Sequence, residues 1–82
     1  MRRPMLYKTM IAQTVEVFKT NVRKVSDASL IMAQLSDLYP AYQFNFNLED
    51  PNYTLCVEGF EPNVGVIQCH LRSLGFNCRI MS

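Results

Sequence analysis

Hydrophobic and polar residues alternate without a fault along residues 42–49, which read Tyr-Gln-Phe-Asn-Phe-Asn-Leu-Glu. Successive side chains of a strand point to opposite faces, so this period of two predicts a half-buried strand with Phe44 and Phe46 toward the core. The same alternation recurs in three shorter segments, which we also predict as strands. These segments are 14–19, 53–58 and 76–81.

The first of these segments, residues 14–19, alternates as Thr-Val-Glu-Val-Phe-Lys. We expect Val15 and Val17 on its buried face. The opposite face would then carry Glu16 together with Phe18, because the two sets of side chains point in opposite directions.

Two further segments follow the helical period. Residues 26–39 form the first, with Ser26 and Asp27 as N-cap and acidic first turn and Pro40 as the stop. Its apolar stripe is formed by Ala28, Ile31, Leu35 and Leu38.

The second predicted helix begins near Pro62 and ends at Leu74. Gly75 follows as the residue that can adopt the left-handed C-terminal cap. The apolar stripe of this helix is formed by Val64, Ile67, Leu71 and Leu74.

The predicted order is therefore β-α-β-β-α-β. Right-handed crossovers place both helices on one face of a four-stranded antiparallel sheet. This is the α+β, ferredoxin-like split βαβ sandwich, in which the other face of the sheet is open.

The composition limits the classes of function. The chain has 82 residues, of which 49% are hydrophobic and 18% charged, and its formal net charge is +1. It is too apolar for disorder and has no apolar run long enough to cross a bilayer. With no net field, neither a nucleic acid nor a membrane is expected as a partner. An odd number of cysteines without close pairing is untypical of secreted disulfide frameworks, which favours a cytoplasmic protein.

Residues 1–12 precede the first predicted strand and are interpreted as an N-terminal extension, flexible or bound to a partner, before a domain at 13–82. The extension begins with Arg2 and Arg3 and then becomes apolar. Lys8 interrupts the apolar stretch, and no small-residue cleavage site follows, so a secretory signal is not expected.

The closing sequence Ser-Leu-Gly-Phe-Asn-Cys-Arg-Ile at 73–80, the valine-rich first strand and the element lengths carry a family resemblance. Residues 14–81 resemble the heavy-metal-associated domains of copper chaperones and metal-transporting ATPases. Members that carry metal bind a soft ion such as Cu(I) through a Gly-Met-x-Cys-x-x-Cys loop after the first strand. The corresponding residues 19–26 contain no Cys, Met or His. The resemblance therefore implies the fold, while no metal ligand or cofactor is carried over.

The three cysteines are predicted in three environments. Cys56 should lie on the open face of the sheet, Cys69 on the solvent side of the second helix, and Cys78 in the core as an inert thiol. They form neither a ligand set nor an intramolecular disulfide in this arrangement. His70, the only histidine, flanks an apolar stripe without a predicted nucleophile or orienting partner, so we do not expect an enzyme.

Four residues have a predicted exposure that folding alone does not explain. They are Phe18, Cys56 and Met81 on the open face and Leu30 on the outer side of the first helix. An apolar patch of this kind is typical of an interaction surface. The leading hypothesis is therefore a non-enzymatic protein-interaction or regulatory module. Its partner would be an unidentified protein or, by self-association, a second copy in a homodimer.

Two alternatives remain open. ACT domains share the same order of elements and sense small ligands such as amino acids. They favour a glycine-bearing loop after the first strand, and Thr20-Asn21-Val22 has no glycine. The other alternative is soft-metal binding between molecules through Cys56 or Cys69.

Overall fold

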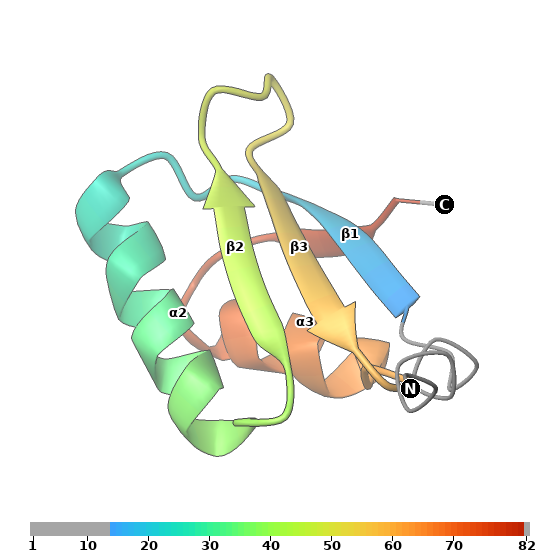
Figure 1. Ribbon diagram of the computed structural model, residues 1–82. Coiled ribbons are helices and arrows are strands. Elements are labelled where there is room, and N and C mark those ends of the chain that lie inside the picture. The colour runs from blue at the N-terminus through green and yellow to red at the C-terminus, as the bar shows by residue number, and fades with distance from the viewer. Residues whose placement is uncertain (1–13, 82) are drawn as a thin grey trace, which may run out of the picture.

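The structure is a computed structural model that describes residues 14–81, and its elements follow the order β-α-β-β-α-β (Figure 1). This confirms the predicted number and order of strands and helices. The elements are β1 (Thr14–Thr20), α2 (Val25–Leu38), β2 (Gln43–Asn47), β3 (Thr54–Gly59), α3 (Val64–Ser73) and β4 (Cys78–Ile80).

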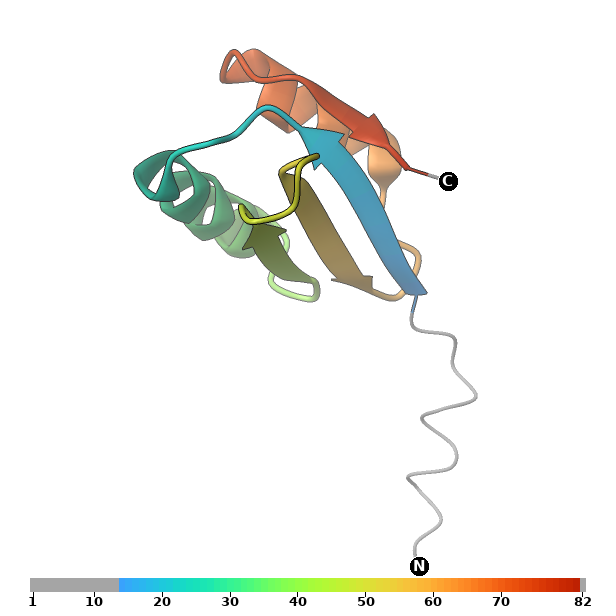
Figure 2. The same ribbon diagram turned by 90° about the horizontal axis from the view of Figure 1, so that it is seen from above.

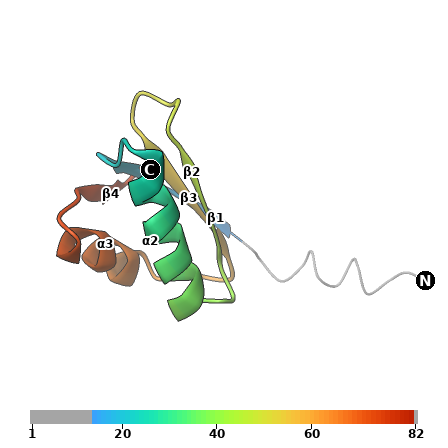
Figure 3. The same cartoon turned by 90° about the vertical axis from the view of Figure 1, so that its left-hand side faces the viewer.

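The strands form one antiparallel sheet in the order β2-β3-β1-β4. β2 and β4 are the edge strands, and β4 lies beside β1 (Figure 2). Both helices pack on the same side of the sheet, with α2 toward β2 and α3 toward β4 (Figure 3). The ferredoxin-like α+β fold predicted from the sequence is confirmed. Within residues 14–81, no helix is long and apolar enough to span a membrane.

The core lies between the sheet and the two helices. Every element except β2 contributes fully buried residues to the core. β2 contributes Phe44, which is 7% exposed, and Phe46, which packs against the edge of the core. The predicted inward direction of both phenylalanines is confirmed. The core consists of Phe18, Val22, Ala28, Ile31, Leu35, Phe44, Leu55, Val57, Ile67, Leu71 and Cys78.

The predicted faces of β1 are wrong. Phe18 is completely buried, whereas Val15 is 55% exposed and lies on the opposite face together with Val17. Shifting a strand by one residue exchanges its faces, and in β1 both faces carry apolar side chains. The larger phenylalanine occupies the buried position, because burying an aromatic ring removes more apolar surface from water than burying a valine. Glu16 shares that face but is only half-buried, near the end of the strand.

Both helices begin differently from the prediction. The N-cap of α2 is Lys24, which supplies no side-chain cap, so Ser26 and Asp27 lie within the first turn. The N-cap of α3 is Asn63, whose Oδ1 accepts a hydrogen bond from the Val66 N–H at 3.1 Å. An asparagine at this position satisfies one of the donors left free by the helix start, which explains why α3 begins after Pro62.

The predicted C-terminal cap of α3 is confirmed. Gly75 has a φ of 93°, in the left-handed region that glycine adopts without a steric penalty. Its N–H donates to the Arg72 carbonyl at 2.9 Å, and the Phe76 N–H donates to the Leu71 carbonyl at 3.0 Å. These two bonds form a Schellman motif, which turns the chain from α3 into β4.

Candidate functional site

The sheet face opposite the helices, called the open face below, is formed by alternate residues of the four strands. Leu55 and Val57 of β3 point into the core. The residues next to them in β3 therefore point the other way, and so do the residues of β1 and β2 that pair with those neighbours. The open face consists of Val15, Val17, Lys19, Gln43, Asn45, Asn47, Thr54, Cys56, Glu58, Arg79 and Met81.

The middle of the open face is apolar. Val17 lies opposite Cys56 in the β1–β3 ladder, and both side chains are half-buried. On the other side of Val17, the Met81 N–H donates to the Val17 carbonyl at 2.8 Å, and Met81 is 41% exposed. Val17, Cys56 and Met81 form this apolar central row, and Asn45 of β2, which lies opposite Cys56, borders it. The face that water reaches is therefore apolar along its centre and polar along β2.

The two ends of the open face differ in charge. Lys19 and Arg79 are register partners in the β1–β4 ladder, and both are exposed, so they form a basic end. Like charges directly opposite each other on a sheet are unfavourable in the absence of a counter-charge. At the other end Glu58 is exposed and lies opposite Val15, which makes this the acidic end.

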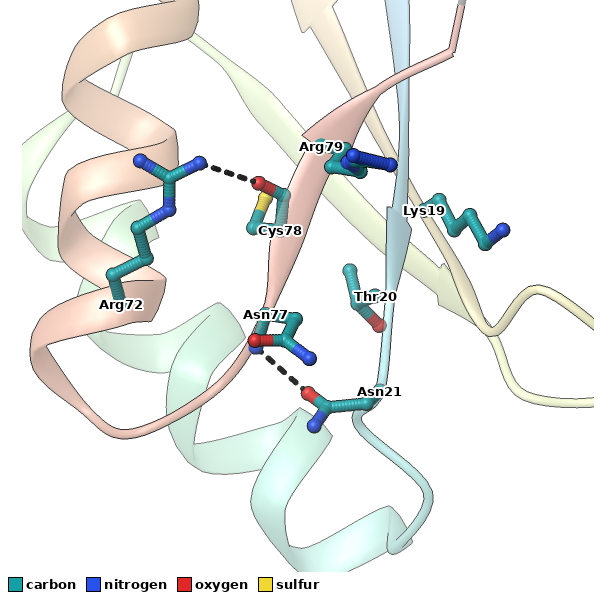
Figure 4. Close-up of a pocket in the computed structure, with 7 residues that line it drawn as sticks. All are labelled: Lys19, Thr20, Asn21, Arg72, Asn77, Cys78 and Arg79. Carbon is teal, nitrogen blue, oxygen red and sulfur yellow. Dashed lines mark hydrogen bonds between the residues drawn. The ribbon is translucent and has the colours of Figure 1, made fainter.

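A cleft of about 430 Å³ lies where β1 and β4 meet the end of α3 (Figure 4). Its lining includes three cationic side chains, Lys19, Arg72 and Arg79, and no carboxylate. Figure 4 shows Arg72 reaching β4 from the helix side, while Lys19 lies on the opposite side of the sheet. Guanidinium and ammonium groups of this kind suit a carboxylate or phosphate.

Two hydrogen bonds order this cleft. The Asn77 N–H donates to Asn21 Oδ1 at 2.8 Å, which ties the start of β4 to the end of β1. Arg72 Nη2 donates to the Cys78 carbonyl at 3.4 Å (Figure 4). The Arg72 guanidinium is therefore partly engaged by the backbone.

The loop after β1, where the resembling family carries its thiolates, is occupied by packing and backbone bonds. Thr20 Oγ1 donates to the Tyr53 carbonyl and accepts the Val22 N–H at 3.1 Å. Val22 itself is completely buried, and Arg23 lies 5.5 Å from the centre of the Tyr53 ring. These contacts direct the loop toward the core and toward the β2–β3 hairpin.

The cysteines are separated as predicted. Cys56 is half-buried on the open face, Cys69 is exposed on α3, and Cys78 is 1% exposed in the core, all three as free thiols. Burial raises the pKa of Cys78 to about 11, although the nearby Arg72 charge acts in the opposite direction. Cys78 therefore stays protonated at neutral pH, and its low reactivity remains a prediction. No cluster of three His, Cys, Asp or Glu residues occurs within 14–81.

His70 links the two helices. Its Nε2 lies 3.0 Å from Gln34 Oε1 of α2, while the Ser73 hydroxyl donates to the His70 carbonyl. The imidazole thus contacts an amide rather than a nucleophile or a carboxylate, which is the arrangement of a structural histidine on a helix flank.

Only two of the four residues predicted as an interaction surface lie together. Cys56 and Met81 share the central row of the open face, whereas Leu30 is 55% exposed on α2, on the other side of the sheet. Phe18 is part of the core, for the reason given above. The sequence pattern did not reveal that Val15 and the charged residues at the two ends lie on the open face. Finding them requires the strand register, which the pattern alone does not give.

Comparisons with protein-family models, curated proteins and solved structures gave no match to this chain.

Proposed function

We propose that this domain is a non-enzymatic protein-interaction module that docks its partner on the open face. The observation that carries the proposal is the apolar central row together with Val15, which extends it along β1. A sheet face that stays in water is normally polar along its whole width, as the alternation of half-buried strands requires. Here Val15 and Met81 expose 55% and 41% of their surface on that face, beside Val17 and Cys56.

Burial of this row against a partner would remove apolar surface from water, at about 25 cal/mol per Å². The rest of the open face supplies the polar rim that protein interfaces have. Asn45 and Asn47 border the row along β2, and charged side chains stand at its two ends. An apolar centre with a polar border is the usual layout of a docking surface.

The resemblance to heavy-metal-associated domains supports the same conclusion. A member without thiolates in its first loop retains the shape of the domain and loses the chemistry that the loop supplies. The side chains of residues 19–26 are cationic, hydroxyl, amide or apolar, and none contains sulfur or imidazole. The function left to such a domain is to bind a partner protein through its surface.

Affinity capture from cells with matched variants tests this proposal. The test variant is Val15→Asp/Met81→Asp on the open face, and the control is Val25→Asp/Leu30→Asp on α2, where both residues are likewise exposed. We expect wild type and control to capture the same proteins, a second copy included, and the open-face variant to lose them. Loss in the α2 variant with retention in the open-face variant would contradict the proposal.

A second candidate function, sensing of a small anionic ligand, is favoured by Lys19 and Arg79, which are register partners on one face of the sheet and line the cleft. It corresponds to the ACT-like alternative. Thermal-shift measurements with amino acids and inorganic phosphate would detect it as a rise in melting temperature. Arg79→Gln should abolish such a rise, whereas Lys24→Gln, an exposed cation outside the cleft, should not.

A further inference from the structure

Building on the function proposed above, we infer that the partner of the open face is a second copy of this chain, held in a symmetric dimer by its charged ends. In a two-fold dimer the same surface is used by both protomers and must complement itself. The open face meets this condition, because it carries a basic end at Lys19 and Arg79 and an acidic end at Glu58.

The charges select one of the two symmetric ways to place the faces together. If the two-fold axis ran parallel to the strands, each basic end would face the other basic end. If the axis crosses the strands at a right angle, the ends exchange, and Glu58 of each protomer approaches the basic end of the other. Lys19 is the nearer cation, since β1 is adjacent to β3 in the sheet. Opposite charges meet only in the second arrangement, which also relieves the repulsion between Lys19 and Arg79.

The hairpin loop beyond the basic end also carries charge, in Glu49 and Asp50. Asp50 Oδ1 accepts the Asn52 N–H at 2.8 Å, which directs this carboxylate to its own loop. Glu49 follows β2 at the edge of the sheet, and two strands separate β2 from β4, which carries Arg79. The central strands β1 and β3 therefore carry the complementary pair.

The central row is compatible with the same axis. Each member of the row would face its own copy: Val17, Cys56 and Met81 form an apolar contact along the axis. Asn45 would face Asn45, and a side-chain amide can both donate to and accept from an identical amide. Two sheets that pack face to face commonly align in this way, with a crossing angle of about 30°.

The size of the open face predicts a reversible dimer. Four strands about 4.8 Å apart, with about 3.4 Å for each residue along the strand, make a face of roughly 15 by 23 Å for the seven residues of β1. The area of this face, the product of the two lengths, is less than half of the roughly 800 Å² per partner of a standard stable interface. We therefore expect monomer and dimer to exchange with protein concentration.

Charge reversal tests the inference. Two variants are prepared in the full chain, Glu58→Lys and Lys19→Glu/Arg79→Glu, and their masses are followed by analytical ultracentrifugation over a range of concentrations. All three residues are exposed, so the variants should fold, which circular dichroism verifies. We expect the wild type to dimerise, each variant alone to dimerise at least about tenfold more weakly, and an equimolar mixture of the two to regain the wild-type affinity. A matched control, Lys24→Glu, should dimerise like the wild type.

Thiol cross-linking provides a second measurement. Cys56 lies near the proposed axis, Cys69 is exposed on α3, and Cys78 is buried. A short bis-maleimide should therefore link two chains through Cys56, and Cys56→Ser should abolish the dimer band while Cys69→Ser retains it. Linkage that depends on Cys69 instead would overturn the inference.

The inference and the proposed function fail differently. A wild type that stays monomeric at the highest concentration, or a mixture of charge variants that does not recover, overturns the dimer. Capture of other proteins through Val15 and Met81 would then still support docking on the open face. Equal capture by wild type and the open-face variant removes the proposed function itself.

Discussion

Phe18 lies directly opposite Leu55 in the β1–β3 ladder, and neither side chain is exposed to solvent. On the other side of β1, Phe18 is in register with Ile80 of β4, so the ring lies between β3 and β4 on the core side of the sheet. This pair determines which face of β1 is buried and therefore which side chains form the open face.

Replacing Phe18 by Ala should lower the free energy of unfolding by about 3–5 kcal/mol, because the ring is completely buried and leaves a cavity. Val17→Ala, one residue away on the open face, should cost about 1 kcal/mol or less, because its side chain is only half-buried. Urea denaturation followed by circular dichroism measures both. If Phe18→Ala is unfolded from the start, Phe18→Leu provides a smaller loss to compare with Val17→Ala. Equal losses at the two positions would contradict the assigned faces.

Gly59→Ala should lower the free energy of unfolding by about 1–3 kcal/mol through overpacking. A Cβ at this position would overlap Cδ1 of the Tyr42 ring, whose hydroxyl donates to the Glu61 carbonyl at 3.3 Å. The matched control is Gly65→Ala in α3, where the nearest atom, Asn63 Oδ1, is 3.6 Å away. Ala is the better helix former, so the control should raise stability by about 0.5–1 kcal/mol. A stabilising effect at both positions would show that Tyr42 moves freely.

The raised pKa of Cys78 predicts a loss of stability at alkaline pH. The unfolded thiol has the ordinary value of 9.0, and the buried one about 11. Above pH 9 the unfolded state therefore releases a proton that the folded state retains. The contribution of the Cys78 thiol to the free energy of unfolding is thus complete below pH 9 and is lost as the pH rises to about 11. Denaturation of the wild type and of Cys78→Ala across this range measures it. The wild type should lose more stability than the variant, and parallel curves would contradict the assignment.

The same burial predicts the reactivity of the thiols. A thiol reagent at pH 8 should modify Cys69 and Cys56 in the folded protein and Cys78 only after unfolding, because the reactive form is the thiolate. Ellman titration of unreduced protein should count two fast thiols when folded and three when unfolded. Fast reaction of Cys78 in folded Cys56→Ser/Cys69→Ser would contradict its placement in the core.

Binding of Cu(I) should depend on protein concentration. No single chain places two of its thiols together, and an exposed thiol alone does not supply the two-sulfur geometry that Cu(I) prefers. Two Cys56 side chains across a dimer would supply it. Competition against a Cu(I) chelator at several protein concentrations, with Cys56→Ser and Cys69→Ser, measures this. Tight one-to-one binding at every concentration, abolished by either substitution, would contradict the expectation.

The order of elements could be predicted because each strand or helix has a clear period, as at Phe44 and Phe46 or at Ile67 and Leu71. The faces of β1 could not, because Val15 and Phe18 offer apolar side chains to both sides of one short strand. Packing against partner strands decides between them. The charged ends of the open face were not predictable either, because they arise from register: Lys19 is beside Arg79 only once β4 has paired with β1.

The bond from Arg72 to the Cys78 carbonyl has a consequence for how this sheet can grow. An edge strand with free carbonyl groups is a template on which another chain can add a strand and start a fibre. β4 is three residues long, and a guanidinium that donates to its carbonyl occupies the very group that an added strand would need. At this edge the guanidinium therefore disfavours the addition of another strand, and in the dimer proposed above the copies would instead meet on the face of the sheet.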